Sequence, residues 1–283
     1  MFTALFPDQK YLIDAATLHA TRESVHLLDL RPAEDFAVGH IAGSRHIDLY
    51  GISIVDTSEA PLTNFLSMVQ ILLGARGVSM DKPVVIYDHE SGERAARAVW
   101  FLSMLGHPDV RILDGGTHAW TAAGYELVQL KQAPLPVDPA KAPPTAPPFR
   151  ANHNLALLAT RFDVERAIDD SQSVIVDVRR ESEYRGTEKR ARRAGTIPGS
   201  VHVFWREHLD AHGAFKHPDE IRALYLSKGI TPDKTIIPLC HGGYRSASTF
   251  IALKSLGYPD VRNYVGAWGE WGNRDDTRIV IPE

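Results

Sequence analysis

Short apolar runs alternate along the chain with longer segments whose apolar residues recur at helical spacing. Residues 84–87 and 236–239 are continuous apolar runs, a pattern typical of strands buried on both faces of a parallel sheet. Residues 94–105 and 245–256 have helical spacing, and a glycine follows each of them as a stop signal. Strands that alternate with helices predict an α/β fold, in which a central, mostly parallel sheet carries helices on both faces.

The motifs of the first half of the chain recur in the same order in the second half. The paired segments are 27–31 and 175–179 (LLDLR, IVDVR), 39–44 and 195–200 (GHIAGS, GTIPGS), 83–88 and 235–240 (PVVIYD, TIIPLC), 105–110 and 256–261 (LGHPDV, LGYPDV), and 115–120 and 266–268 (GGTHAW, GAW). The spacing between them drifts by only a few residues. Five matches in one order indicate two diverged copies of a whole domain rather than a short solenoid repeat.

A stretch rich in proline separates the two copies. Seven of the fifteen positions from 134 to 148 are proline. Such a stretch cannot propagate a helix and is typical of a semi-rigid linker. We therefore expect a first domain over residues 1–133, a linker over 134–149 and a second domain over 150–283.

Composition and charge mainly exclude classes of function. The 31 Lys and Arg residues against 35 Asp and Glu residues give a net charge of −4, which offers no basic surface for nucleic acid or an anionic membrane. No apolar run approaches the roughly 18–20 residues of a membrane helix, and residues 1–12 lack the apolar stretch of a signal peptide. The sequence predicts a cytoplasmic protein that binds neither nucleic acid nor membranes. The thirteen histidines show no ligand spacing, so we expect no metal and no cofactor.

The single cysteine, Cys240, stands where a nucleophile is expected. It ends a predicted strand and precedes a predicted helix, at the edge where open α/β sheets place their ligands. Gly242 and Gly243 let several backbone N–H groups converge on one point, and the helix N-terminus adds its positive dipole. Arg245 supplies a permanent cation one turn away. Each factor stabilises a thiolate, so we interpret Cys240 as a nucleophile rather than an inert core residue.

The first copy lacks this chemistry. Its corresponding strand ends in Asp88, and Glu90 and Glu93 make the following loop acidic. A carboxylate cannot act as a sulfur nucleophile. We therefore expect the first domain to be catalytically inactive, to pack against the second domain and to form one wall of the site.

One further pair of motifs calls for a structural interpretation. Asp29 and Asp177 end predicted strands, and each stands two residues before an arginine, Arg31 or Arg179. We expect ion pairs that fix the following loops rather than a part in the chemistry.

At these residues the sequence resembles the two-domain rhodaneses, the thiosulfate and 3-mercaptopyruvate sulfurtransferases, over nearly its whole length. The resemblance rests on segments 29–31 (DLR) and 39–43 (GHIAG), 113–116 (LDGG) with Trp120, 240–246 (CHGGYRS), and 268–274 (WGEWGNR). In that family only the second copy usually carries the catalytic Cys, and an Asp commonly stands in the first copy. Cys240 and Asp88 follow this pattern. The resemblance implies two tandem rhodanese-like domains, of which the second is catalytic.

The resemblance also implies a covalent transfer in two steps. The Cys240 thiolate attacks the outer sulfur of a small donor such as thiosulfate, and sulfite leaves. The persulfide then passes to a thiophilic acceptor, which is cyanide in an assay and a thiol or a protein cysteine in the cell. Loop N–H groups hold the persulfide, and Arg245 orients the anionic donor or, alternatively, fixes the loop through a salt bridge. The substrate-binding residues that this resemblance implies in the loop are His241, Gly242, Gly243, Tyr244, Arg245 and Ser246.

The choice of donor leaves alternatives open. The thiosulfate enzymes often place Arg and Lys directly after the Cys, and the mercaptopyruvate enzymes often have Cys-Gly-Ser-Gly, whereas His241 and Gly242 stand here. Arginine at the fifth position after the Cys, followed by Ser246, is closer to a bacterial thiosulfate-type loop. We therefore predict thiosulfate as the donor. The alternatives are 3-mercaptopyruvate, and a persulfide carrier that serves a protein acceptor.

Outside the loop, the family's early motif in the second domain often has an arginine before the aromatic residue. Here Glu183 stands before Tyr184, and Arg185 follows it. We predict that Arg185 binds the donor. The basic run 189–193 (KRARR) is the alternative source of a cation, and a solvated loop is its other interpretation.

The length of the loop argues against a phosphatase. Four residues separate Cys240 from Arg245, whereas the related phosphatases have five, because a larger tetrahedral group needs a wider loop. The loop also offers no general acid for a leaving alcohol. Sulfur transfer is therefore the favoured chemistry.

Overall fold

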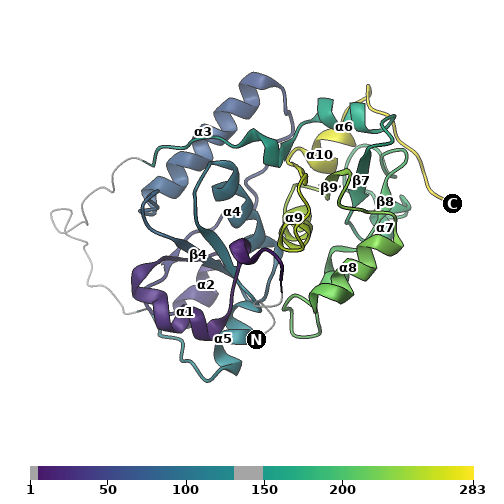
Figure 1. Cartoon of the computed structure of the whole chain (residues 1–283). Helices are drawn as coiled ribbons and strands as arrows, with labels where there is room; N and C mark the ends of the chain where they lie inside the picture. The colour runs from purple at the N-terminus through teal and green to yellow at the C-terminus, as the bar shows by residue number, and fades with distance from the viewer. Residues whose placement is uncertain (1–5, 131–148) are drawn as a thin grey trace.

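A computed structural model describes residues 6–130 and 149–283, and it shows two α/β units side by side (Figure 1). Of the predicted linker, 134–149, only residue 149 lies within the described residues. Phe149 is buried, and its backbone carbonyl accepts a hydrogen bond of 2.5 Å from the side-chain amide of Gln70. The described part of the second unit therefore begins at a residue that is bound to helix α3 of the first unit.

The first unit is built on a five-stranded sheet in which all pairs are parallel and the order is β1-β5-β4-β2-β3. The strands are β1 (Leu12–Ile13), β2 (His26–Asp29), β3 (Arg45–His46), β4 (Val84–Tyr87) and β5 (Val110–Leu113). Its helices are α1 (Ala15–Thr21), α2 (Ala33–Val38), α3 (Glu59–Ala75), α4 (Glu93–Met104) and α5 (Gly116–Ala122), with 3-10 turns η2 (Gln9–Tyr11) and η3 (Arg22–Ser24). Alternate residues of β4 face different clusters: Ile86 packs with α3 and α4, and Val85 packs with α1 and α5. Helices thus cover both faces, as the apolar runs predict.

The second unit repeats this arrangement. Its strands are β6 (Leu158–Ala159), β7 (Ser173–Asp177), β8 (Val201–His202), β9 (Thr235–Leu239) and β10 (Asn263–Tyr264). Strands β8-β7-β9 and β10-β6 form parallel groups, and a parallel bridge between Ile236 and Val261 connects the two groups. The helices are α6 (Arg161–Ala167), α7 (Glu181–Tyr184), α8 (Pro218–Ser227), α9 (Arg245–Ser255) and α10 (Ala267–Trp271), with 3-10 turns η5 (Leu155–Leu157) and η6 (Trp205–His208). The order of strands matches that of the first unit, which confirms the predicted fold class.

Each unit contains the predicted Asp–Arg ion pair at the end of its second strand. The Arg31–Asp29 and Arg179–Asp177 pairs are both buried with N···O distances of 2.6 Å. The same guanidinium groups donate to the carbonyls of Gly39 (2.6 Å) and Gly195 (2.7 Å). Each pair therefore links the end of a strand to the loop beyond it, in the structural role expected from the sequence.

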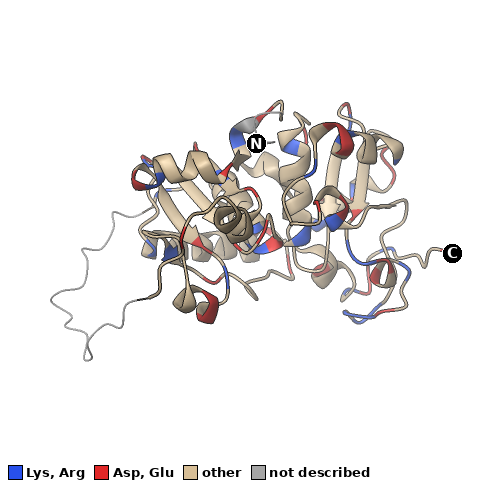
Figure 2. Cartoon of the chain, turned by 90° about the horizontal axis from the view of Figure 1, so that it is seen from below, with Lys and Arg blue, Asp and Glu red and all other residues tan. Residues whose placement is uncertain are grey.

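Helices α4 and α9 pack against each other where the units meet, so one core cluster runs through both units. Residues 95–104 of α4 are all buried, unlike those of a helix with one face in water. Ring contacts add to this interface, for example Tyr11 edge-on to Phe250 at 5.9 Å between centroids. Acidic and basic segments also lie next to each other where the units face one another (Figure 2).

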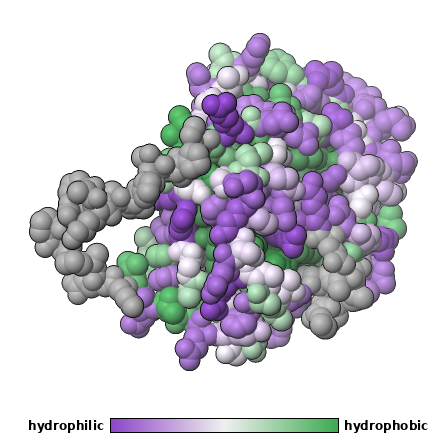
Figure 3. All heavy atoms as spheres, turned by 60° about the vertical axis from the view of Figure 1, so that its left-hand side comes forward, coloured by the Kyte–Doolittle hydropathy of each residue, from purple (hydrophilic) through white to green (hydrophobic). Residues whose placement is uncertain are grey.

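The face drawn in Figure 3 is largely hydrophilic, with small hydrophobic patches scattered over it. Among the described residues, no helix has both the length and the apolar character needed to cross a membrane.

Candidate active site

The loop that follows β9 carries Cys240 to the carboxyl end of the parallel strands, where the second unit faces the first. The next helix, α9, begins at Arg245, so the loop and the helix N-terminus surround the sulfur. Cys240 is 1% exposed. Its carbonyl accepts a hydrogen bond of 2.9 Å from the Trp268 N–H, which joins the loop to α10. The location is the one expected from the sequence.

Two donors contact the sulfur directly. The Gly243 N–H lies 3.1 Å from Cys240 Sγ, and the Ser246 hydroxyl lies 3.6 Å from it. Gly243 has a φ of +82°, a backbone angle that residues with a side chain rarely adopt. A Cβ at this position would also lie 3.0 Å from the Arg97 guanidinium. The glycine is therefore required for the loop to turn its N–H toward the sulfur.

The electrostatics of the loop favour a thiolate. Burial opposes the charged sulfur, but the positive charge of Arg245 and hydrogen bonds from Ser246 and the loop backbone outweigh it, so the pKa of Cys240 lies below its ordinary value. The surroundings of Cys240 thus favour the thiolate form of its side chain.

Arg245 is held by a buried carboxylate that the sequence did not single out as functional. Its guanidinium lies 2.6 Å and 3.1 Å from the two oxygens of Glu183 in α7. Glu183 is 1% exposed, and Arg190 lies 3.7 Å from the same carboxylate. Glu183 thus fixes the cation beside the sulfur. The salt bridge expected for Arg245 is present, and it runs to a neighbouring helix rather than within α9.

A pocket of about 730 Å³ opens at Cys240 and is lined by both units. The first unit contributes Tyr50, Gly51, Ser53 and Glu93, and therefore forms one wall, as expected. The second unit contributes Arg180, Glu188, Arg190, Phe204, Trp205, Arg206, Cys240, His241, Gly242, Tyr244 and Arg245. Gly243 and Ser246 lie behind the sulfur and bind it instead of facing the pocket.

Arg185, which the sequence predicts to bind the donor, does not line this pocket. Its guanidinium pairs with Glu181 at 2.8 Å and bonds to the carbonyl of Glu283, at the end of the chain. The short helix α7 ends at Tyr184, and Arg185 follows it as the C-cap residue. Arg190, from the basic run considered as the alternative, does line the pocket.

His241 and Tyr244 have different surroundings in the pocket. Burial and the nearby charge of Arg190 lower the pKa of His241, which favours the neutral imidazole, and its buried Nδ1 has no hydrogen-bond partner among the described residues. The Tyr244 hydroxyl donates to the carbonyls of Leu49 (3.0 Å) and Ile52 (3.1 Å) in the first unit. Tyr244 is therefore a wall that also joins the units.

The corresponding loop of the first unit closes around Asp88. The carboxylate accepts hydrogen bonds from the N–H groups of Glu90 (3.0 Å), Gly92 (3.2 Å) and Ala95 (3.1 Å). A Cβ at Gly92 would lie 2.6 Å from the Asp88 carboxylate. The first loop thus keeps converging N–H groups, filled by a carboxylate of the chain itself, which agrees with a loop that has lost the nucleophile.

The buried Asp88 carboxyl makes stability depend on pH. Burial raises the pKa of Asp88 to about 7, against about 3.9 in an unfolded chain. Because the folded state binds the proton more tightly, the stabilisation from this group is complete below about pH 4 and is lost as the pH rises through about 7. We expect the free energy of unfolding to fall between about pH 4 and pH 7, and to fall less in Asp88→Asn. Urea denaturation at a series of pH values measures this, and equal slopes in both proteins would contradict it.

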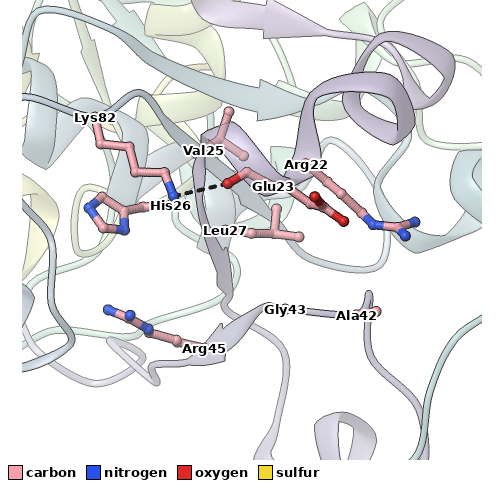
Figure 4. Close-up of a pocket in the computed structure, with 9 residues that line it drawn as sticks. All are labelled: Arg22, Glu23, Val25, His26, Leu27, Ala42, Gly43, Arg45 and Lys82. Atoms are coloured by element: carbon pink, nitrogen blue, oxygen red, sulfur yellow. Dashed lines mark hydrogen bonds between the residues drawn. The ribbon is translucent and has the colours of Figure 1, made fainter. Parts of the chain in front are cut away.

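A second pocket, of about 430 Å³, lies at the opposite edge of the first sheet, near the starts of β2 and β4 (Figure 4). It is basic, but two of its three Lys and Arg side chains bind the backbone. Lys82 donates to the Glu23 carbonyl at 3.2 Å, and Arg45 donates to the Arg76 carbonyl at 2.8 Å. Its lining residues include no thiol or hydroxyl group. The candidate active site is therefore the pocket at Cys240.

The rhodanese-like domain family matches this chain twice, over residues 14–123 and 160–274. The chain therefore belongs to the rhodanese family and contains two copies of its domain. This confirms the resemblance found in the motifs.

Relatives support the same conclusion over most of the chain. A protein of Azotobacter vinelandii named thiosulfate sulfurtransferase is 32% identical, and the match covers 98% of this chain and 99% of the relative. A protein of Thermus thermophilus named sulfur carrier protein TtuD is 35% identical over 84% of each chain. Among solved structures, the anaerobic ergothioneine biosynthesis enzyme of Chlorobium limicola superposes with a TM-score of 0.82 at 18% identity, covering 98% of this chain and 72% of that one. At that identity, the structural likeness bears on the fold alone.

Proposed function

We propose that this protein is a sulfurtransferase that moves a sulfane sulfur from thiosulfate to a thiophilic acceptor through a persulfide on Cys240. The observation that carries the proposal is the contact of 3.1 Å between the Gly243 N–H and Cys240 Sγ, in a pocket that also holds Arg245. A buried sulfur with an N–H donor and a fixed cation is suited to nucleophilic attack. The name of the Azotobacter vinelandii relative supports this activity.

In the first step, the Cys240 thiolate attacks the outer sulfur of thiosulfate. A new S–S bond forms, the S–S bond of thiosulfate breaks, and its electron pair leaves with sulfite. In the second step, the acceptor attacks the outer sulfur of the persulfide, and the electron pair of that S–S bond returns to Cys240. With cyanide the product is thiocyanate, no proton is consumed, and the thiolate is regenerated. The N–H of Gly243 and the hydroxyl of Ser246 serve as donors to the sulfur of Cys240.

The basic side chains of the pocket are suited to a donor dianion, and Arg190 is the cation for which the chain offers a matched control. Arg190 and Arg185 have the same side-chain exposure, 45%, but only Arg190 lines the pocket. We expect Arg190→Ala to lower kcat/KM for thiosulfate about tenfold, the effect of one lost charge-assisted contact. Arg185→Ala is expected to match the wild type. Initial rates of thiocyanate formation measure both. A larger loss in Arg185→Ala than in Arg190→Ala would show that the donor binds elsewhere.

The experiment that tests the proposed function compares kcat/KM for thiosulfate and for 3-mercaptopyruvate, with cyanide as acceptor. The proposal expects thiosulfate to be the better donor. A clear preference for 3-mercaptopyruvate would keep sulfur transfer but replace the donor. If neither donor supports sulfur transfer, the proposal that this protein is a sulfurtransferase is rejected.

A persulfide carrier is a second candidate, supported by the relative named sulfur carrier protein. A carrier would load sulfur on Cys240 yet turn over poorly until a protein thiol accepts it. Loading without turnover on cyanide, together with release to an added protein thiol, would favour this candidate. The cytoplasmic location stays a prediction from the sequence.

A further inference from the structure

Arg97, in the middle of α4, is a buried arginine of the inactive unit that contacts the active loop of the other unit. Its side chain is 0% exposed. Within residues 6–130 and 149–283, no carboxylate forms an ion pair with it, and its Nε has no hydrogen-bond partner. Burial lowers its pKa to about 10, and the charge of Cys240 acts against that shift. Burying a cation without a counter-ion is costly, so its contacts call for an explanation beyond stability.

Four contacts fix the guanidinium of Arg97. One is with the ring of Phe101 on the same helix, at 4.9 Å from its centroid, and two of the other three are with residues that line the pocket, Gly242 and Tyr244. Nη1 donates to the carbonyl oxygen of Gly242. Nη2 donates to the carbonyl of Ile52 at 2.9 Å. The plane of the guanidinium lies over the ring of Tyr244, 3.8 Å from its centroid. Arg97 thus holds the backbone of the active loop from the side opposite the sulfur.

The peptide between Gly242 and Gly243 connects Arg97 to Cys240. In a trans peptide the C=O and N–H bonds point in opposite directions. The oxygen of this peptide is bound by Arg97, and its N–H lies 3.1 Å from Cys240 Sγ. We propose that Arg97 is a positioning residue that fixes the Gly242–Gly243 peptide with its N–H toward the sulfur, so that the thiolate and the persulfide formed on it are stabilised.

The two glycines explain why the peptide needs such a clamp. A rotation of the whole peptide plane requires only compensating changes in ψ of Gly242 and φ of Gly243, and glycine tolerates both. The reversed peptide would direct its carbonyl oxygen at the thiolate and would raise the pKa of Cys240. The guanidinium of Arg97 opposes this rotation, because one rigid planar group binds the carbonyls of both Gly242 and Ile52.

The test measures the rate of alkylation of Cys240 by iodoacetamide as a function of pH, in the full chain. Since Cys240 is the single cysteine, the rate follows its thiolate alone. The variants are Arg97→Gln, which removes the charge and the fork, and Arg97→Lys, which keeps the charge with one ammonium group. Arg94→Gln is the control on the same helix. Arg94 pairs with Asp48 at 3.3 Å and lies 4.0 Å from the ring centroid of Tyr50, so its loss removes an arginine beside the pocket that has no bond to the Gly242 carbonyl. The other titratable groups around the sulfur are unchanged in all variants. They are Tyr50, Glu93, Arg180, Glu183, Glu188, Arg190, His241, Arg206, Tyr244 and Arg245.

We expect the midpoint of the alkylation profile to rise by about one pH unit or more in Arg97→Gln. It should rise by a smaller but measurable amount in Arg97→Lys, and it should stay at the wild-type value in Arg94→Gln. Circular dichroism and the melting temperature establish that each variant is folded. If Arg97→Gln does not fold, Arg97→Lys decides. A wild-type midpoint in a folded Arg97→Lys would overturn the proposal, as would one in a folded Arg97→Gln.

The role of Arg97 rests on the proposed function only where it concerns turnover. We expect the rate of sulfur transfer at neutral pH to fall about tenfold in Arg97→Gln. The two failures are distinguishable. A wild-type protein that takes no sulfur from thiosulfate, but whose alkylation midpoint still moves with Arg97, would reject the proposed function and keep the positioning role. Normal sulfur transfer by the wild type, with an unchanged alkylation midpoint in the Arg97 variants, would keep the proposed function and reject the positioning role.

Discussion

Replacing Cys240 with serine lowers sulfur transfer from thiosulfate to cyanide by a factor of about 10³ or more, because the step that forms the persulfide has no other nucleophile in this chain. Serine keeps an acceptor for the N–H of Gly243, so the loop retains its geometry. A hydroxyl at this position stays protonated and cannot form a persulfide. Thiocyanate formation under saturating thiosulfate measures the loss.

The control for this variant is structural. Cys240 is buried, so its replacement is judged by circular dichroism and by the melting temperature alongside activity. Cys240→Ala should show the same loss of transfer as Cys240→Ser, although it removes the acceptor of the Gly243 N–H. Substantial thiocyanate formation by either folded variant would contradict covalent transfer through this residue.

Replacing Arg245 alone should cost both stability and transfer. The pair that it forms with Glu183 has side-chain exposures of 12% and 1%. Removing one partner of a buried pair leaves the other charge uncompensated and typically costs about 3–5 kcal/mol. We expect Arg245→Met to lie toward the lower end, because Arg190 remains 3.7 Å from the Glu183 carboxylate. Urea denaturation measures the free energy of unfolding.

The double variant Arg245→Met with Glu183→Met separates the two roles of Arg245. Two apolar side chains can replace a buried ion pair with little loss of stability. The double variant should therefore regain most of the free energy of unfolding lost in Arg245→Met. Its transfer rate should stay low, because the charge that lowers the pKa of Cys240 is still missing. Recovery of both stability and transfer would mean that Arg245 serves the fold alone.

Much of the fold follows from local pattern. The run 84–87 coincides with β4, and the helix expected over 245–256 is α9 to within one residue. Cys240 and the loop around it could also be predicted, since strand, glycines and helix are consecutive in the chain. In these segments the hydrophobic period and the turn residues agree with the tertiary structure.

The missed residues act across long separations in the chain. Arg97 bonds to a residue 145 positions away, and this contact exists only because α4 and α9 pack together. In the sequence of α4, Arg94 and Arg97 are spaced like the polar face of a surface helix, whereas the helix is buried on nearly all sides. The one available signal was the expectation that the first domain forms a wall of the site.

Side-chain direction accounts for the other differences. Glu183 and Arg185 stand on either side of Tyr184, yet one points to Arg245 and the other to Glu181. Glu183 lies inside α7, whereas Arg185 follows its last residue. A motif in the sequence does not specify the direction of its side chains. The charge reversal at Glu183, noted as a departure from the family pattern, was the signal for the buried ion pair with Arg245.

The most direct test of the account is the mass of the full chain after incubation with thiosulfate in the absence of an acceptor. The account predicts the addition of one sulfur atom per chain, located on the peptide that contains Cys240 and removed by cyanide. A chain that gains no sulfur, or one that gains it equally in Cys240→Ser, would contradict a persulfide on Cys240 as the intermediate of transfer.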